Sequence, residues 1–151
     1  VGAHVRHGDK KTESSVVPME HYLAAALQVA DGLRPNAAPH LLYLSTDDPV
    51  ALAEARTWAA DLGQSRARII AREGEVRGVS TATDQVVQMH RVNATRYGEE
   101  AILNLLLLAR TDAFVGTFSS NFGRLAFELA YARQAGNVVP VSMDVFWHAY
   151  P

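Results

Sequence analysis

Side chains able to bind an anion or move a proton gather directly after the short apolar segment at residues 1–5. This polar stretch reads Arg6-His7-Gly8-Asp9-Lys10-Lys11-Thr12-Glu13. The apolar segment predicts a buried strand, and the polar stretch predicts a loop at its carboxyl end. In open α/β sheets, ligands bind at the carboxyl ends of the strands. We therefore expect this loop to face a phosphorylated ligand and the reacting centre.

A second polar stretch, Thr117-Phe118-Ser119-Ser120-Asn121, follows another apolar segment and precedes an expected helix. Hydroxyl groups and free backbone N–H groups at a helix N-terminus favour an anion, because the helix dipole and the unpaired donors act together. Arg6, from the first loop, can clamp a phosphate with two parallel hydrogen bonds. The two loops together are expected to hold a diphosphate leaving group.

Each of these residues also has a purely structural interpretation. Ser119 and Ser120 can simply cap their helix, Arg6 can form an ion pair within the fold, and His4 can be a core histidine. Asn104 lies inside an apolar helix, where a buried amide must find partners, so we expect it to bond either a ligand or a neighbouring loop.

Other features carry less information about function. Asp47 and Asp48 suggest a metal site, but a cap on the following helix explains them sufficiently, and we expect no metal. The tripeptide Asn93-Ala94-Thr95 is a glycosylation acceptor pattern and points only weakly to a secretory lumen.

The composition is that of an ordinary globular domain. The chain has 151 residues, 48% of them hydrophobic, and a formal net charge of −2. The lack of a basic excess disfavours nucleic-acid binding. There are no cysteines, which excludes disulfides and thiolate metal sites. Because the chain starts inside an apparent strand, we expect a single domain, residues 1–151, cut from a longer protein whose missing parts would provide any membrane attachment.

The spacing of apolar residues and turn residues predicts alternating strands and helices. Strands are expected at residues 1–6, 40–46, 66–71, 112–117 and 138–141, and helices at 18–32, 49–62, 99–110 and 124–134. Residues 72–97 show little periodicity and are expected to be irregular. Pro140 suggests an edge strand. Short spacing without hairpin signals predicts an α/β fold, with a mostly parallel, Rossmann-like sheet covered by helices on both faces.

Several of these segments resemble the α-1,6-fucosyltransferases that modify the N-glycan core and include bacterial nodulation enzymes. His4-Val5-Arg6-His7-Gly8-Asp9-Lys10 is similar to the family's His-Val-Arg-Arg-x-Asp-Lys, and Thr12-Glu13 followed by Pro18-x-Glu20-x-Tyr22 also resembles it. Residues 43–49, Tyr-Leu-Ser-Thr-Asp-Asp-Pro, resemble the family's Tyr-Leu-Ala-Thr-Asp-Asp-Pro. Residues 117–124, Thr-Phe-Ser-Ser-Asn-Phe-Gly-Arg, resemble Thr-Phe-Ser-Ser-Gln-x-x-Arg. The motifs agree in order and spacing along nearly the whole chain.

The resemblance implies the donor-binding half of a GT-B-like glycosyltransferase. The implied reaction is an inverting transfer of fucose from GDP-β-L-fucose to a glycan hydroxyl, without a metal or other cofactor, in the Golgi lumen. By position, Arg6 would bind the β-phosphate and His4 would lie at the nucleotide. Glu13 would be the general base, assisted by Lys10 and Asp9. The remaining implied donor-binding residues are His7, Asn104, Ser119, Ser120, Asn121 and Arg124.

Two departures from the family pattern keep other functions open. The family's second arginine is His7 here, and histidine is mostly neutral near pH 7, which lowers the expected phosphate affinity. The family's guanine-reading aspartate aligns with Asn104, whose carboxamide has only one acceptor oxygen. The alternatives are a degenerate nucleotide-sugar-binding module without catalysis, and a transferase that uses a different sugar nucleotide.

Overall fold

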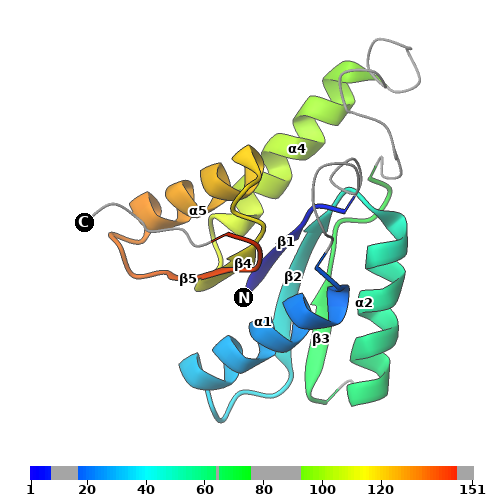
Figure 1. Cartoon of the computed structure of the whole chain (residues 1–151), viewed down its shortest axis with the longest axis vertical. Helices are drawn as coiled ribbons and strands as arrows, with labels where there is room; N and C mark the ends of the chain where they lie inside the picture. The colour runs from blue at the N-terminus through cyan, green and yellow to red at the C-terminus, as the bar shows by residue number, and fades with distance from the viewer. Residues whose placement is uncertain (8–16, 64, 76–92, 146–151) are drawn as a thin grey trace.

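The structure, a computed structural model, describes residues 1–7, 17–63, 65–75 and 93–145. In these residues five strands alternate with four helices along the chain (Figure 1). The strands are β1 (Gly2–Val5), β2 (His40–Thr46), β3 (Ala67–Ile70), β4 (Ala113–Gly116) and β5 (Val139–Ser142). The helices are α1 (Met19–Leu33), α2 (Pro49–Leu62), α4 (Ala94–Leu108) and α5 (Asn121–Arg133).

The strands form one parallel sheet in the order β3-β2-β1-β4-β5. This order is the Rossmann arrangement, in which the chain winds outward from β1 in one direction and then returns to continue on its other side. The predicted fold class is therefore confirmed. Pro140 lies on β5, which is an edge strand, as its missing N–H group requires.

Helices cover both faces of the sheet, and each face has its own apolar cluster (Figure 1). On one face, Ala3 and Val5 of β1 pack with residues of α1 and α2. On the other, Phe114 of β4 packs with residues of α4 and α5. Successive strand residues point to opposite faces. His4, between Ala3 and Val5, consequently lies on the α5 side, where its ring contacts Phe122.

Strand β2 and helix α2 have the predicted boundaries, because local signals define them. The Oδ1 atom of Asp48 accepts a hydrogen bond from the Val50 N–H at 2.8 Å, and Pro49 occupies the first helical position. Gly63 ends the helix with a φ of 86°, in the region that favours glycine.

The boundaries of three helices were predicted incorrectly. Helix α4 begins at Ala94 rather than at residue 99, because Asn93 caps it by accepting from the Arg96 N–H at 3.0 Å. Helix α5 begins at Asn121 rather than at residue 124, with Ser120 in the N-cap position. Helix α1 extends one residue past Gly32, and Pro18 is its N-cap residue instead of its first helical residue.

Among the described helices, none is both long and apolar enough to cross a membrane.

Candidate functional site

Several predicted site residues among those that the structure describes lie where the winding of the sheet changes direction. Strand β1 pairs with both β2 and β4, and the chain reaches these two neighbours through helices on opposite faces. The separating connections leave a crevice beyond the carboxyl ends of the strands, which is the usual ligand site of such sheets. His4 and Arg6 come from the end of β1, and the turn 117–120 comes from the end of β4.

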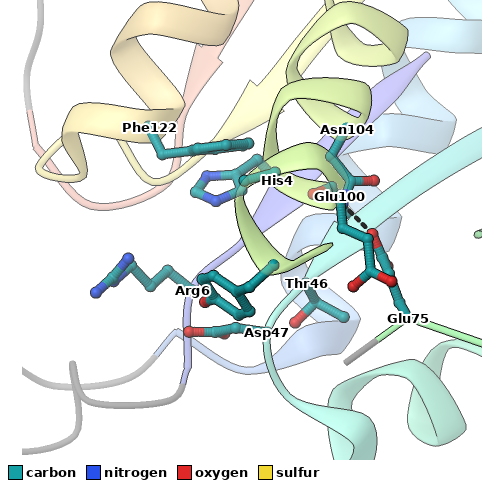
Figure 2. A pocket seen from close by; sticks show the side chains of 11 residues that line it. His4, Arg6, Thr46, Asp47, Glu75, Glu100, Asn104 and Phe122 are labelled. Atoms are coloured by element: carbon teal, nitrogen blue, oxygen red, sulfur yellow. Dashed lines mark hydrogen bonds between the residues drawn. The ribbon is translucent and has the colours of Figure 1, made fainter. Parts of the chain in front are cut away.

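A cavity of about 230 Å³ opens at this place (Figure 2). It is smaller than the ~300–1,000 Å³ of typical small-molecule pockets, so it accommodates part of a ligand, such as a heterocyclic base. The residues that line it come from the ends of β1 and β2, the segment after β3, one face of α4 and the first turn of α5. They are His4, Arg6, Ser45, Thr46, Asp47, Glu75, Tyr97, Glu100, Ala101, Asn104 and Phe122.

His4 forms one wall of the cavity. Its ring lies 4.9 Å from that of Phe122, centroid to centroid, and the residue is 6% exposed. Burial, and secondarily the nearby Arg6 guanidinium, lower the pKa of His4 to about 3. The ring is therefore neutral at physiological pH. Among the described residues its buried Nδ1 atom has no hydrogen-bond partner.

Gly123 lets α5 approach this histidine closely. A Cβ atom added at Gly123 would lie 3.1 Å from His4 Nδ1 and 2.4 Å from the Thr117 carbonyl oxygen. The second distance is shorter than any real contact of this kind, and a backbone oxygen cannot move aside easily. Glycine at this position therefore seats the first turn of α5 against the ends of β1 and β4.

Arg6 and Asp47 lie on one side of the cavity, and Glu75, Glu100 and Asn104 lie on the other, which we call the acidic end (Figure 2). The Arg6 side chain extends away from Glu75, Glu100 and Asn104, which lie together on the other side. Asn104 does find the partners that a buried amide requires, and they are protein groups. Its Oδ1 accepts from the Tyr43 hydroxyl, and its Nδ2 donates to Glu75 Oε1.

Two arginines hold the carboxylates of the acidic end. Arg72 Nη1 donates to Glu75 Oε1 and to the Glu100 carbonyl oxygen, each at 3.1 Å. Arg96 Nε donates to Glu100 Oε1 at 2.9 Å, one helical turn away along α4. These contacts fix both carboxylates in the cavity wall.

The turn between β4 and α5 already binds a carboxylate of the chain itself. Asp144 Oδ1 accepts from the Phe118 N–H at 2.8 Å, and its Oδ2 accepts from the Ser119 N–H at 3.2 Å. The Tyr22 hydroxyl forms a hydrogen bond with Thr117 Oγ1 at 2.7 Å, which connects α1 to the turn. Two backbone N–H groups of this turn therefore bind a carboxylate in this structure, while phosphate binding there stays a prediction.

The remaining predicted residues differ in how close they lie to the cavity. Ser120, 4% exposed, occupies the N-cap position of α5, but its side chain makes no capping hydrogen bond, contrary to the simple capping interpretation. Asn121 Oδ1 accepts from Arg124 Nη2 on the exposed first turn of α5. Ser120, Asn121 and Arg124 do not line the cavity. His7 is buried with its Nε2 at 2.8 Å from the Val17 carbonyl oxygen, and does not line it either.

The three residues for which the resemblance implies catalysis, Asp9, Lys10 and Glu13, lie outside the described residues. Their roles remain predictions.

Of the residues that line the cavity, sequence reasoning predicted only His4, Arg6 and Asn104, and the most informative of those it missed are Tyr97, Glu100, Phe122 and Glu75. Tyr97 and Glu100 lie on the same face of α4 as Asn104, at helical spacing, and this polar stripe in an apolar helix was a usable signal. Phe122 follows directly after the serine-rich turn, but nothing in its type distinguishes it from a core residue. Glu75 lies in a stretch without periodicity and carries no local signal.

No sequence model of a known protein family matches the chain. Its structure is similar to the crystal structure of NodZ α-1,6-fucosyltransferase co-crystallised with GDP, with a TM-score of 0.48 and 22% identity. It is likewise similar to NodZ α-1,6-fucosyltransferase soaked with GDP-fucose, with a TM-score of 0.46 and 22% identity. Each similarity covers 85% of this chain, and the chain spans about a third of the compared structures, 34% and 35%.

Proposed function

We propose that this chain is the donor-binding half of an inverting glycosyltransferase, which transfers L-fucose from GDP-β-L-fucose to a hydroxyl group of a glycan. One observation carries the proposal. Arg6 and the turn 117–120 follow adjacent parallel strands, β1 and β4, where the winding of the sheet changes direction, and Arg6 lines a cavity of a size suited to a base. These are the segments whose motifs resemble the fucosyltransferases.

In this proposal the diphosphate lies toward Arg6 and the backbone amides of the turn 117–120, and the base enters the acidic end of the cavity. The side on which Arg6 lies supports this orientation, because a guanidinium binds phosphate. As the bond between fucose and GDP breaks, negative charge grows on the β-phosphate. Preorganised donors stabilise that charge, and Arg6 supplies two N–H groups in a geometry that matches a phosphate.

Inversion requires a base on the face of the sugar opposite the leaving GDP. The resemblance assigns this role to Glu13, with Lys10 and Asp9 assisting. Glu13 would take the proton from the acceptor hydroxyl as its oxygen attacks the anomeric carbon. In this proposal no metal takes part, the acceptor is a glycan, and the parent protein works in the Golgi lumen.

Two observations favour a second candidate, a nucleotide-sugar-binding module without catalysis. His7, which replaces an arginine of the family pattern, contacts the Val17 carbonyl oxygen instead of lining the cavity. Asp144 occupies two amides of the turn expected to bind phosphate. Both features would weaken donor binding relative to a fully active enzyme.

Calorimetric titration of the chain with GDP, ADP and UDP tests donor binding. We expect selective GDP binding that Arg6→Ala abolishes. The matched control is Arg110→Ala, which removes an exposed arginine after α4, at the opposite end of the sheet, and should leave binding unchanged. Preference for ADP or UDP would discard fucose as the sugar, and absence of binding to all three would contradict the proposed function.

A transfer assay on the full-length parent protein separates enzyme from binding module. Glu13→Gln should abolish fucose transfer while GDP affinity stays within a factor of about two, because the proposed base does not touch the nucleotide. If the parent binds GDP selectively but transfers no fucose to any glycan, the binding module is the correct alternative.

A further inference from the structure

The acidic end of the cavity contains the carboxylate of Glu75, which lies outside the segments that resemble the fucosyltransferases. The Glu75 side chain is 4% exposed and lines the cavity between Asn104 and Glu100 (Figure 2). A buried carboxylate is normally held by hydrogen bonds or by a cation. Glu75 has both, because Asn104 Nδ2 and Arg72 Nη1 donate to its Oε1 atom.

Asn104 is committed to positioning this carboxylate. Its carbonyl oxygen accepts from the Tyr43 hydroxyl, and its amino group donates to Glu75. An ionised carboxylate can only accept hydrogen bonds, so the amide cannot turn over without placing its oxygen against the carboxylate. Tyr43, Asn104 and Glu75 thus form a chain of hydrogen bonds with a fixed direction, which ends at the cavity.

The hydrogen-bonding edges of the bases respond differently to such a wall. Guanine presents two adjacent donors, its ring N1–H and its exocyclic amino group, which match the acceptor oxygens of a carboxylate. Adenine and cytosine each pair one amino donor with a ring nitrogen acceptor, and uracil flanks its single N–H with two carbonyl oxygens. A carboxylate repels those acceptors, because both partners present lone pairs.

We infer that Glu75, held by Asn104, is the residue through which the cavity selects guanine. This inference rests on the proposed function, because it assumes that a nucleoside diphosphate occupies the cavity. It assigns guanine recognition to Glu75 acting with Asn104, and it makes Asn104 a positioning residue. Phe122 and Tyr97 also line the cavity and offer aromatic faces on which a base can stack regardless of its identity.

Calorimetric titration of the chain with GDP and inosine diphosphate tests the inference without any substitution. Inosine diphosphate keeps the N1–H group but lacks the exocyclic amino group. A hydrogen bond to a charged group contributes enough that its loss should weaken binding about 10-fold or more. Equal affinity for the two nucleotides would overturn the inference, while GDP binding itself would leave the proposed function standing.

Substitutions then identify the carboxylate responsible. Glu75→Gln should weaken GDP binding about 10- to 100-fold and remove the preference for GDP over inosine diphosphate. It should change ADP and UDP binding little. The matched control is Glu73→Gln, two residues earlier, whose side chain is 80% exposed and does not line the cavity. Circular dichroism of each variant establishes that it is folded.

Three outcomes distinguish the inference from the function on which it rests. If Glu75→Gln is folded and retains full GDP selectivity, the inference is wrong and the proposed function survives. If Glu100→Gln removes the selectivity instead, Glu100 is the carboxylate that recognises guanine and the assignment to Glu75 is overturned. If the unaltered chain binds no nucleoside diphosphate, the proposed function fails first.

Discussion

Burial of His4 makes the stability of the fold depend on pH. The pKa of His4 falls from 6.5 to about 3, mainly because burial disfavours the charged ring. Between these two values the unfolded chain binds a proton at this site and the folded chain does not. The His4 contribution to stability is therefore complete above pH 6.5 and is lost progressively as the pH falls toward 3.

The size of the effect follows from the two pKa values. Protonation of the unfolded state at pH 5 favours unfolding by about 2 kcal/mol relative to pH 7, since each pH unit below 6.5 contributes up to about 1.4 kcal/mol. That is a large part of the ~5–15 kcal/mol by which a typical domain is stable. Urea denaturation followed by circular dichroism at pH 7 and pH 5 measures it.

Comparison with a variant isolates the histidine from other titrating groups. His4→Gln has nothing to titrate at this position, so its stability should fall about 2 kcal/mol less between the two pH values than that of the unaltered chain. The control is His21→Gln, which removes a histidine whose side chain is 61% exposed instead of buried. Identical pH dependence for His4→Gln and the unaltered chain would refute the reasoning and mean that the folded state accepts a proton on His4.

Three further predictions concern the elements that support the site. Asp48→Ala should lower the free energy of unfolding by about 1 kcal/mol in urea denaturation, because it removes the cap of α2. Asp48→Asn should retain most of the stability that the cap contributes, because its amide oxygen can also accept from the Val50 N–H. Gly123→Ala should lower the melting temperature and weaken GDP binding, because its Cβ would collide with the Thr117 carbonyl oxygen. Gly32→Ala, which meets nothing within 4 Å inside α1, should instead stabilise the fold by about 0.5–1 kcal/mol. Asp144→Asn should raise GDP affinity severalfold in calorimetry, since it removes a negative charge from the amides of Phe118 and Ser119; a fall in affinity would show that the carboxylate supports the turn instead of competing with phosphate.

The sequence predicted the elements that short-range chemistry defines. Strand β2 and helix α2 were placed correctly because Asp48, Pro49 and Gly63 mark the boundaries of the helix within a few positions. The start of α4 was missed although Asn93 is a good capping residue. The irregular composition of the preceding stretch outweighed that single signal. The alternating order of strands and helices predicted a mostly parallel sheet, which the topology confirms, whereas the adjacency of β1 and β4 comes from the structure.

Helix α4 shows why the acidic end could not be predicted in the same way. Its sequence is rich in leucine, and hydrophobic patterning favours burial of that face. The structure instead leaves Leu103 and Leu106 46% and 44% exposed, and buries Glu100 and Asn104. Glu100 has a local partner in Arg96, one helical turn away, but the side-chain partners of Asn104 are Tyr43 and Glu75, which are distant in sequence. The polar stripe on α4 is visible in the sequence, but these distant partners are not.

The distant partners of Asn104 also change how its role in guanine binding is interpreted. Considered alone, Asn104 predicts weakened guanine selectivity, because it offers one acceptor oxygen where the resemblance implies a carboxylate. In the structure that oxygen is bonded to Tyr43, and the amino group of Asn104 holds the carboxylate of Glu75 in the cavity wall. If the cavity binds guanine, Glu75, in the segment after β3, supplies the carboxylate. Asn104, on α4, holds that carboxylate in position. An amide at position 104 then becomes a requirement, because a second carboxylate there would repel Glu75.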